Sequence, residues 1–227
     1  MMIDNASIIS FLSDFVSEQR RNRIEEVQAQ RTRYVTVVLE DIYQSQNASA
    51  VLRTCECLGI QDINIIENYN SYRVNPLVVR GSDKWLNIRK FKGPEYNSSK
   101  AIKKIKSEGY RIIATSLHGT SVELCSFDLY RGKCAVVFGN EHQGVSEDVL
   151  KEADEHLKIP MCGFTQSLNV SVAAGVVLSH LMQKLKQSTI KWNITAAEKE
   201  ILCVEWLKCS VKHPEMLIRQ LMERDRK

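Results

Sequence analysis

The sequence is organised around Val136-Val137-Phe138-Gly139-Asn140-Glu141-His142-Gln143-Gly144, in which an apolar run passes into a loop that contains two glycines. A second stretch, at residues 159–171, reads Ile-Pro-Met-Cys-Gly-Phe-Thr-Gln-Ser-Leu-Asn-Val-Ser, which predicts a strand end, a loop and a helix start. Glycine has no Cβ, so its backbone can approach a ligand closely and adopt positive φ. The glycines of these two stretches therefore predict a ligand-lined corner, formed by Gly139, Gly144 and Gly163.

The residues after Ser167 predict a helix with one apolar face. Apolar residues recur there at helical spacing, at Val170, Ala173, Ala174, Val177, Leu178, Leu181 and Leu185. Several members of this face are small, so another backbone can pack very close to the helix.

Outward from these stretches, strands and helices alternate along the chain. Apolar or β-branched runs predict strands at 34–39, 63–66, 85–91, 110–115, 134–138 and 156–159. Between them we expect a helix capped by Ser45 or Asn47 and ended by Gly59, and further helices at 98–108 and 147–153. Residues 68–84 read as a long loop. This alternation predicts an α/β fold with a largely parallel sheet. Ligands of such sheets bind beyond the carboxyl ends of the strands, here at Thr115, Gly139 and Ile159.

Composition is ordinary for a globular protein, with 44% apolar and 26% charged residues. No apolar run approaches the length of about 18 residues that a membrane span needs. The first residues lack the basic and apolar pattern of a signal peptide, so we expect a cytoplasmic protein. The seven cysteines include no Cys-x-x-Cys pair and the histidines are scattered, so we expect reduced thiols and no metal site.

Positive charge is concentrated in the middle of the chain. The formal net charge is +4, but residues 71–111 carry eleven Lys or Arg against three Asp or Glu, a balance of +8. Such a segment favours a polyanionic partner, although residues 100–106 on a helix are equally compatible with a solvated face. The sequence contains no Gly-x-Gly-x-x-Gly after a strand and no Gly-x-Ser-x-Gly around Ser167, which argues against a dinucleotide site and a serine hydrolase.

Three separated motifs resemble those of the SpoU (TrmH) branch of the SPOUT RNA methyltransferases. They are Gln46-Asn47-Ala48-Ser49-Ala50-Val51-Leu52-Arg53-Thr54-Cys55, the Gly-Asn-Glu-x-x-Gly at 139–144, and the Ile-Pro-Met-x-Gly-x-x-Gln-Ser-Leu-Asn-Val-Ser-Val-Ala at 159–173. The resemblance covers roughly residues 34–186, and the flanks are most similar to tRNA D-loop guanosine 2′-O-methyltransferases. It implies a deep C-terminal trefoil knot, bound S-adenosyl-L-methionine (S-adenosylmethionine below), a tRNA substrate and a homodimer.

The resemblance also implies roles for individual residues. Thr115, Gly139, Ile159 and Leu168 are expected around the cofactor, although Ile159 and Leu168 are equally compatible with simple core positions. Asn47, Glu141, Ser167 and Asn169 match the polar motif residues of the catalytic site. We assign Asn47 and Asn169 to site geometry and RNA contact, and Glu141 to holding the loops. Asn169 has a competing interpretation as a helix cap only.

Arg53 is the predicted catalytic residue, because the family's arginine is proposed to remove the ribose 2′-hydroxyl proton. Without the resemblance, a surface ion pair with Glu56 is the commoner interpretation. A guanidinium stays protonated, so stabilisation of a developing alkoxide is easier to justify than proton abstraction.

We expect RNA contacts at Arg73, Arg80, Lys84, Arg20 and Arg21. For the two in the N-terminal helical segment, a self-compensating surface helix is the alternative. The expected organisation is a helical extension at 1–32, the knotted domain at 33–188 and a second helical extension at 189–227. Two alternatives to a tRNA enzyme stay open: a ribosomal RNA 2′-O-methyltransferase of the same family, and an inactive RNA-binding protein with this fold.

Overall fold

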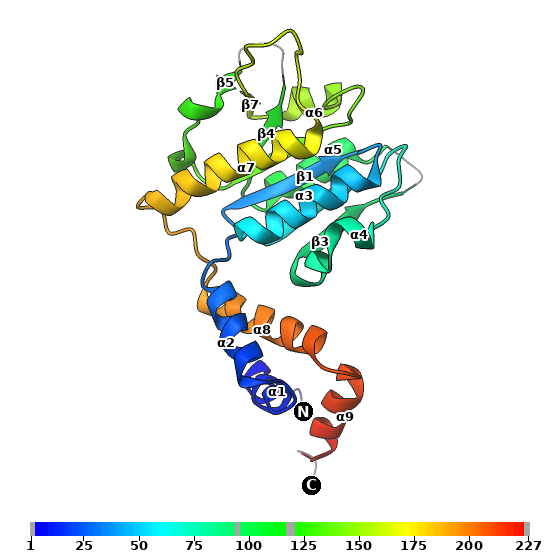
Figure 1. Ribbon diagram of the computed structural model, residues 1–227, viewed down its shortest axis with the longest axis vertical. Coiled ribbons are helices and arrows are strands. Elements are labelled where there is room, and N and C mark those ends of the chain that lie inside the picture. The colour runs from blue at the N-terminus through cyan, green and yellow to red at the C-terminus, as the bar shows by residue number, and fades with distance from the viewer. Residues whose placement is uncertain (1–2, 94–95, 117–120, 225–227) are drawn as a thin grey trace. The chain divides into compact units, whose positions relative to one another are not determined.

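The computed structural model describes residues 3–93, 96–116 and 121–224, and the chain divides into two compact units. Residues 32–192 form an α/β unit, and residues 1–31 with 193–227 form a helical unit. The ribbon in Figure 1 shows the strands and helices of both units.

The α/β unit is built on a parallel sheet. Its strands are β1 (Val35–Glu40), β2 (Asp62–Ile66), β3 (Asn87–Phe91), β4 (Arg111–Thr115), β5 (Val122–Glu123), β6 (Cys134–Phe138) and β7 (Glu155–Lys158). Within the described residues they form one sheet in the order β3-β2-β1-β6-β4-β7-β5, with every neighbouring pair parallel. The predicted α/β class with a largely parallel sheet is confirmed.

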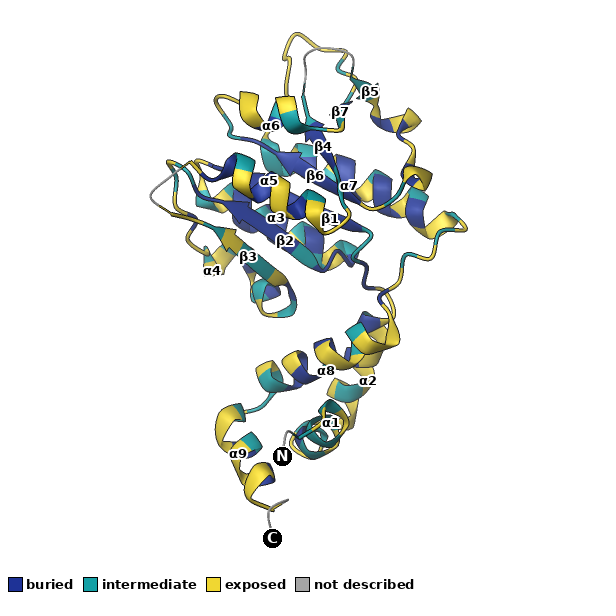
Figure 2. Ribbon diagram, turned by 180° about the vertical axis from the view of Figure 1, so that it is seen from behind, coloured by how far each residue is buried: buried dark blue, intermediate teal, exposed yellow. Residues whose placement is uncertain are grey.

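Helices cover both faces of this sheet. The helices of the unit are α3 (Ser45–Leu58), α4 (Pro76–Val79), α5 (Ser98–Ser107), α6 (Glu147–Glu152) and α7 (Val170–Gln187), with single 3-10 turns at Ser82–Trp85, Leu124–Ser126 and Leu129–Arg131. Helices α3 and α7 pack on each other over one face, and α5 and α6 cover the other. Alternate residues of β1 enter opposite cores, Val37 with α3 and Val38 with α5. Figure 2 shows this buried centre between exposed helix surfaces.

The predicted strands and long helices are present, and most bounds differ by one or two residues. Gly59 ends α3 in the left-handed region, with φ of 86°, as its position predicted. The expected loop at 68–84 contains the four-residue helix α4, which is too short to produce a periodic pattern. The expectation that Ser45 or Asn47 caps α3 was wrong: Gln44 is the cap residue and forms no side-chain cap.

The helical unit joins the two ends of the chain. Helices α1 (Asn5–Ser13) and α2 (Glu18–Gln28) pack against α8 (Ala196–Ser210), and α1 also contacts α9 (Pro214–Arg224). Leu12 and Ile24 are buried on the N-terminal side, and Trp206 and Leu207 on the C-terminal side. The Gln28 side chain donates to the Lys199 carbonyl at 3.0 Å. None of the helices in the described part of the chain has the length and apolarity to cross a bilayer.

Gly109, which follows α5, offers a test of the helix terminations. Its φ is 86°, and a Cβ added there meets nothing within 4 Å, so substitution affects only the backbone conformation. We expect Gly109→Ala to lower the free energy of unfolding by about 1 kcal/mol, because a left-handed conformation disfavours residues with a Cβ. Gly109→Asn should retain most of that stability, since asparagine tolerates this conformation. Urea denaturation checks both, and an alanine variant as stable as the parent would contradict the explanation.

Candidate active site

A cavity of about 570 Å³ opens at the carboxyl edge of the sheet. The ends of β4, β6 and β7 and the first turns of α7 line it. All four residues expected around a cofactor contribute to its wall: Thr115, Gly139, Ile159 and Leu168. The volume and mixed polar and apolar lining suit a small organic ligand. Their role in binding stays a prediction, but the structure does bring these residues together.

The loop after β6 is closed on itself by backbone hydrogen bonds. The Asn140 amide donates to the Gly144 carbonyl at 2.9 Å, and the Gly144 amide donates to the Asn140 carbonyl at 2.8 Å. A Cβ on Gly139 would lie 2.2 Å from the backbone of Gly144 and Val145, closer than atoms can approach. Position 139 therefore admits only glycine, which lets the loop close against the strand end at the cavity wall.

Glu141 ties this loop to the start of α3. Its carboxylate accepts hydrogen bonds from the amides of Tyr43 at 2.8 Å and Gln44 at 3.1 Å, and from the side-chain amide of Asn47 at 2.8 Å. A carboxylate from a distant loop thus stabilises the N-terminus of the helix, where a negative charge is favourable. The caps predicted at Ser45 and Asn47 from the local sequence are absent, because the carboxylate that holds this helix start comes from a distant loop.

Asn47 also contacts the third motif. Its side-chain oxygen accepts from the Asn169 amide at 3.3 Å. The Asn169 oxygen in turn accepts from the Ser171 amide at 2.9 Å and the Ser171 hydroxyl at 2.6 Å, which makes Asn169 the cap of α7. Asn169 therefore caps the helix and also contacts Asn47, while its part in RNA contact stays a prediction. Ser167, which is exposed, lines the cavity next to these residues.

Two opposing effects act on the pKa of Glu141. Partial burial raises the pKa, whereas the hydrogen bonds from Asn47, Tyr43 and Gln44 lower it. The hydrogen bonds prevail, and the pKa lies below its ordinary value. Glu141 is therefore a carboxylate at neutral pH, which suits a positioning group that only accepts hydrogen bonds.

Arg53 is placed apart from this group. It is exposed on α3 and lines a separate, open cavity of about 670 Å³ together with Leu77, Arg80, Gly175 and Ser179. Six residues along an α-helix correspond to about 9 Å and a turn of about 240°, so Asn47 and Arg53 face different directions. Among the described residues, none pairs with the Arg53 guanidinium, and the alternative ion pair with Glu56 is not formed.

The residues predicted to contact RNA fall in both units. Arg80 shares the cavity of Arg53 and has a left-handed backbone with φ of 49°, which is uncommon outside glycine. Arg73 is fixed through its amide, 3.4 Å from the Ser45 hydroxyl, and Lys84 lies in the 3-10 turn after Gly81. Arg20 and Arg21 lie in α2 of the helical unit, where the Arg21 guanidinium donates to the Ser13 carbonyl at 2.8 Å.

Much of the positive charge of residues 71–111 is compensated within the fold. Arg89 forms a bidentate pair with Glu108 at 2.6 and 2.9 Å, and Lys90 pairs with Glu67 at 3.0 Å. The other ion pairs of the segment are Lys103–Glu152, Lys104–Glu108, Lys106–Asp154 and Arg111–Glu155. The balance of +8 therefore overstates the field that this surface presents to a polyanion.

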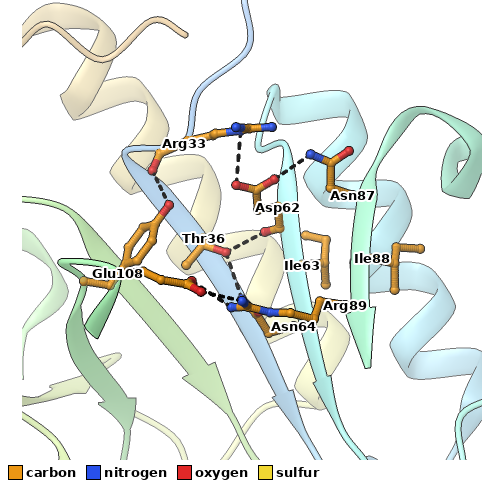
Figure 3. A pocket seen from close by; sticks show the side chains of 10 residues that line it. Arg33, Thr36, Asp62, Ile63, Asn64, Asn87, Ile88, Arg89 and Glu108 are labelled. Carbon is orange, nitrogen blue, oxygen red and sulfur yellow. Dashed lines mark hydrogen bonds and ion pairs between the residues drawn. The ribbon is translucent and has the colours of Figure 1, made fainter. Parts of the chain in front are cut away.

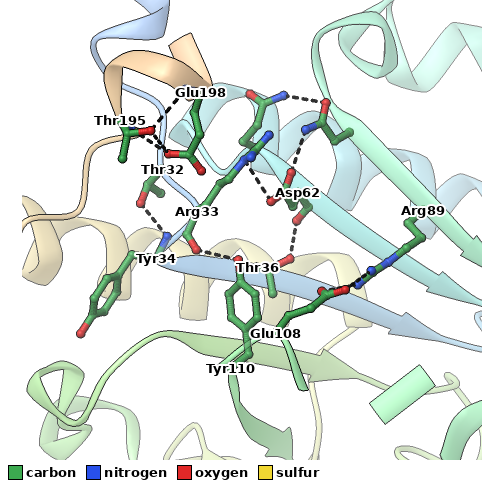
Figure 4. A network of polar contacts seen from close by, with 12 residues as sticks. Thr32, Arg33, Tyr34, Thr36, Asp62, Arg89, Glu108, Tyr110, Thr195 and Glu198 are labelled. Carbon is green, nitrogen blue, oxygen red and sulfur yellow. Dashed lines mark hydrogen bonds and ion pairs between the residues drawn. The ribbon is translucent and has the colours of Figure 1, made fainter. Parts of the chain in front are cut away.

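One of these pairs, Arg89–Glu108, lines a cavity of about 310 Å³ at the amino edge of the sheet, shown in Figure 3. The Asp62 carboxylate accepts from Asn87 at 2.9 Å and lies 3.3 Å from Arg33. Figure 4 shows how the contacts continue, with the Tyr110 hydroxyl donating to the Arg33 carbonyl at 2.8 Å. The bonds from Arg89 hold the pKa of Glu108 below its usual value. The polar groups of this cavity bond to one another, which indicates that they stabilise the fold.

Asp41 is a site residue that sequence reasoning missed. Its φ is 51°, and one carboxylate oxygen accepts from three successive amides, Asn68 at 3.0 Å and Tyr69 and Asn70 at 2.8 Å. Its carbonyl accepts from the Asn140 side chain at 2.8 Å. Asp41 thereby joins the loops after β1, β2 and β6. An aspartate directly after a buried strand, where a left-handed turn residue is common, is the signal that could have identified it.

Comparison with known proteins gives a consistent result. A profile of the SpoU rRNA methylase family matches residues 34–179. The tRNA (guanosine(18)-2′-O)-methyltransferase of Borreliella burgdorferi is 44% identical over 209 residues, 92% of this chain and 94% of that protein. The Thermus thermophilus enzyme of the same name is 39% identical over 75% of this chain and 86% of its own. The crystal structure of the Aquifex aeolicus TrmH/SpoU tRNA modifying enzyme has a TM-score of 0.75 at 30% identity, covering 86% of this chain and 98% of that one.

Substitution of Glu141 tests the link between the loops. Because its folded-state pKa lies below the unfolded value of about 4.3, the ionised group stabilises the fold above that pH, and the contribution is lost as the pH falls through the folded pKa. We expect Glu141→Gln to lower the free energy of unfolding by at most about 1 kcal/mol at pH 7, because solvent screens the partly exposed carboxylate, with the difference shrinking below about pH 4.

Chemical denaturation of the two proteins between pH 3 and pH 7, about the range in which a carboxyl titrates, measures this difference. Glu147→Gln is the matched control, because Glu147 is exposed and pairs only with Lys151 one turn away among the described residues. A difference that does not change with pH would show that the Glu141 charge contributes nothing.

Proposed function

Because this chain belongs to the SpoU rRNA methylase family, we propose that it transfers a methyl group from S-adenosylmethionine to the ribose 2′-hydroxyl of guanosine 18 in the D-loop of tRNA. The substrate follows from relatives that carry this name and align with most of the chain, at 44% and 39% identity. The single structural observation that supports the proposal is the convergence of the second and third motifs on one cavity at the carboxyl edge.

The cavity fits the proposed cofactor. Gly139 lets the loop after β6 close at the cavity wall, where any side chain would collide with it. Ile159 and Leu168 offer apolar surface for an aromatic base, while Thr115 and Ser167 bring hydroxyls to the same wall. The bound cofactor would supply an electrophilic methyl group. The residues of the chain would hold the acceptor hydroxyl in line with it, and orientation of this kind lowers a barrier by about 7–11 kcal/mol at best.

We propose different roles for the polar motif residues. We assign positioning to Asn47, Glu141 and Asn169, whose hydrogen bonds fix the start of α3 against the start of α7. Ser167, at the cavity wall, would contact the substrate or cofactor directly. Arg53 would stabilise the developing alkoxide as a cation. A guanidinium with a pKa above about 12 is a poor general base, and electrostatic stabilisation uses its permanent charge.

We further propose that the enzyme is a homodimer. In a single chain Arg53 lines one cavity and the residues of the proposed donor site line another, so the site as assigned is incomplete. Near Arg53 the surface is apolar: Val172 and Val176 on α7 are 51% and 41% exposed, and Leu77 on α4 is 85% exposed. A contiguous apolar patch on a monomer commonly marks an interface. A second copy that covers α7 would bring one chain's guanidinium toward the other's donor cavity.

The family resemblance and the TM-score of 0.75 support a trefoil knot within residues 33–188 as the catalytic domain, with helical extensions at 1–32 and 189–227. The structural division after residue 31 and after residue 192 lies within a few residues of these limits. A tRNA substrate would place the enzyme in the cytoplasm.

Mapping of ribose methylation tests the proposed function. The purified protein, unmodified tRNA transcripts and S-adenosylmethionine should yield one 2′-O-methylguanosine, which nuclease digestion and mass spectrometry would locate at guanosine 18. Methylation of ribosomal RNA alone would favour the ribosomal alternative. Specific tRNA binding without methylation would favour an inactive RNA-binding protein.

Arg53→Ala should abolish turnover while the cofactor still binds. We expect kcat to fall at least about 100-fold, the effect of removing one preorganised charge from a transition state, with cofactor affinity within about twofold of the parent. Calorimetry with S-adenosylmethionine and single-turnover methylation separate the two quantities. An active alanine variant would rule out both proposed roles.

A mixture of inactive variants tests the shared site. Gly139→Ala should lose cofactor binding because its Cβ collides with the loop. If a dimer combines Arg53 of one chain with the cavity of the other, mixing Arg53→Ala with Gly139→Ala subunits should restore about a quarter of the activity per chain, as random pairing leaves one intact site in half of the dimers. No recovery after subunit exchange would place Arg53 and the cavity in the same site of one chain.

A further inference from the structure

Two tyrosines at the carboxyl edge of the sheet are exposed without a structural reason. Tyr43, after β1, is 58% exposed, and Tyr69, after β2, is 84% exposed. Their hydroxyls form no hydrogen bond with the described residues. An aromatic ring is a large apolar surface, and such rings on a protein surface are typical of binding sites.

The backbone of each tyrosine is nevertheless held in place. The Tyr43 amide donates to Glu141 at 2.8 Å, and the Tyr69 amide donates to Asp41 at 2.8 Å. The amides on either side of Tyr69, those of Asn68 and Asn70, donate to the same Asp41 oxygen. Rings on anchored backbone lose little conformational freedom when they bind, so this arrangement favours recognition.

The two tyrosines leave adjacent points of the sheet. Glu40 and Ile66 are register partners on the neighbouring strands β1 and β2, and each tyrosine follows its strand by three residues. Each ring also has a second ring beside it. Tyr43 meets His142 with centroids 5.3 Å apart, and Tyr69 meets Tyr96 at 6.1 Å. Aromatic side chains thus follow the ends of β3, β2, β1 and β6 in the order of the sheet.

This row ends at the candidate active site. His142, the ring partner of Tyr43, lines the 570 Å³ cavity, and Glu141, which anchors Tyr43, also holds Asn47. Tyr69, in the middle of the row, lies in a loop that also carries Arg73, four residues later. Exposed rings next to a methyl-transfer site, in a loop that also carries a cation, match a nucleic-acid ligand better than an apolar protein surface.

We propose that Tyr43 and Tyr69 form a stacking platform for unpaired bases that flank the methylated ribose. This inference rests on the proposed function, because it assumes that the substrate is a tRNA loop. Proteins recognise single-stranded RNA loops by stacking splayed bases on aromatic side chains, whereas paired bases are not accessible in this way. Many cations of residues 71–111 are already paired within the fold. The platform would therefore hold the substrate by ring contact in addition to phosphate contact.

A binding cycle with modified tRNA tests the platform. One tRNA is intact, and a second lacks the bases on both sides of the methylated guanosine but keeps its backbone. At fixed salt, Tyr43→Leu and Tyr69→Leu should each weaken binding of intact tRNA about tenfold, as expected for loss of one stacked base. On the abasic tRNA the same substitutions should change affinity less than about twofold. Phenylalanine at either position should keep the affinity of the parent, since the ring alone stacks.

Tyr130→Leu is the matched control. Tyr130 is similarly exposed, at 64%, but lies in the turn at Leu129–Arg131 that leads into the amino end of β6. Its substitution should leave both tRNA affinities unchanged. The position of the methyl group and the affinity for S-adenosylmethionine, measured on the same variants, separate loss of RNA contact from loss of the site.

Three outcomes would overturn the platform. If both leucine variants bound intact tRNA with the affinity of the parent, the exposed rings would instead mark a site for a protein partner. If both variants lost equal affinity for intact and abasic tRNA, the rings would not contact a base. In both cases methylation of tRNA by the parent protein would leave the proposed function standing. If the parent protein methylated no tRNA, the proposed function would fall and the platform with it.

Discussion

The geometry of the candidate site depends on one carboxylate. Glu141 accepts hydrogen bonds from two backbone amides before α3 and from the Asn47 side chain, and Asn47 reaches Asn169 at the start of α7. Three segments separated by many residues in the chain are therefore fixed relative to one another by a single negative charge. The contacts are charge-assisted, which makes them stronger than ordinary hydrogen bonds. Without the charge, the loop after β6 would no longer be held against the starts of α3 and α7.

A second carboxylate extends the same construction to the neighbouring strand. Asp41 gathers the amides of the loop after β2, and its carbonyl accepts from Asn140. The cavity wall and the exposed tyrosines are thus attached to one framework of short polar contacts at the carboxyl edge. At the amino edge, Arg33, Asp62, Arg89 and Glu108 form a separate set of pairs that satisfy one another. The polar groups of the amino edge bond to one another, whereas the carboxyl edge presents exposed side chains.

The local parts of this structure could be predicted from the sequence. The central strand β6 is an uninterrupted apolar run because both faces of the parallel sheet are covered, and Gly59 marks a helix end because it adopts positive φ. What failed depends on contacts between distant segments. The carboxylate that holds the start of α3 comes from Glu141, 97 residues beyond Gln44, and part of the positive segment is compensated by distant partners such as Asp154 and Glu155. Thr115, Gly139 and Ile159 were predicted from the strand ends and Leu168 from motif resemblance, whereas the separation of Arg53 from that cavity depends on how distant segments pack.

The helical unit has a consequence for the order in which the protein is made. Helices α1 and α2 emerge from the ribosome before the sheet, yet the helix they pack on, α8, is synthesised after it. Translation proceeds at about 5–20 residues per second, so Leu12 and Ile24 stay uncovered for about ten seconds or more while the sheet assembles. Helices α1 and α2 therefore complete their packing only after α8 has been made, and until then the nascent chain exposes apolar side chains that chaperones can bind.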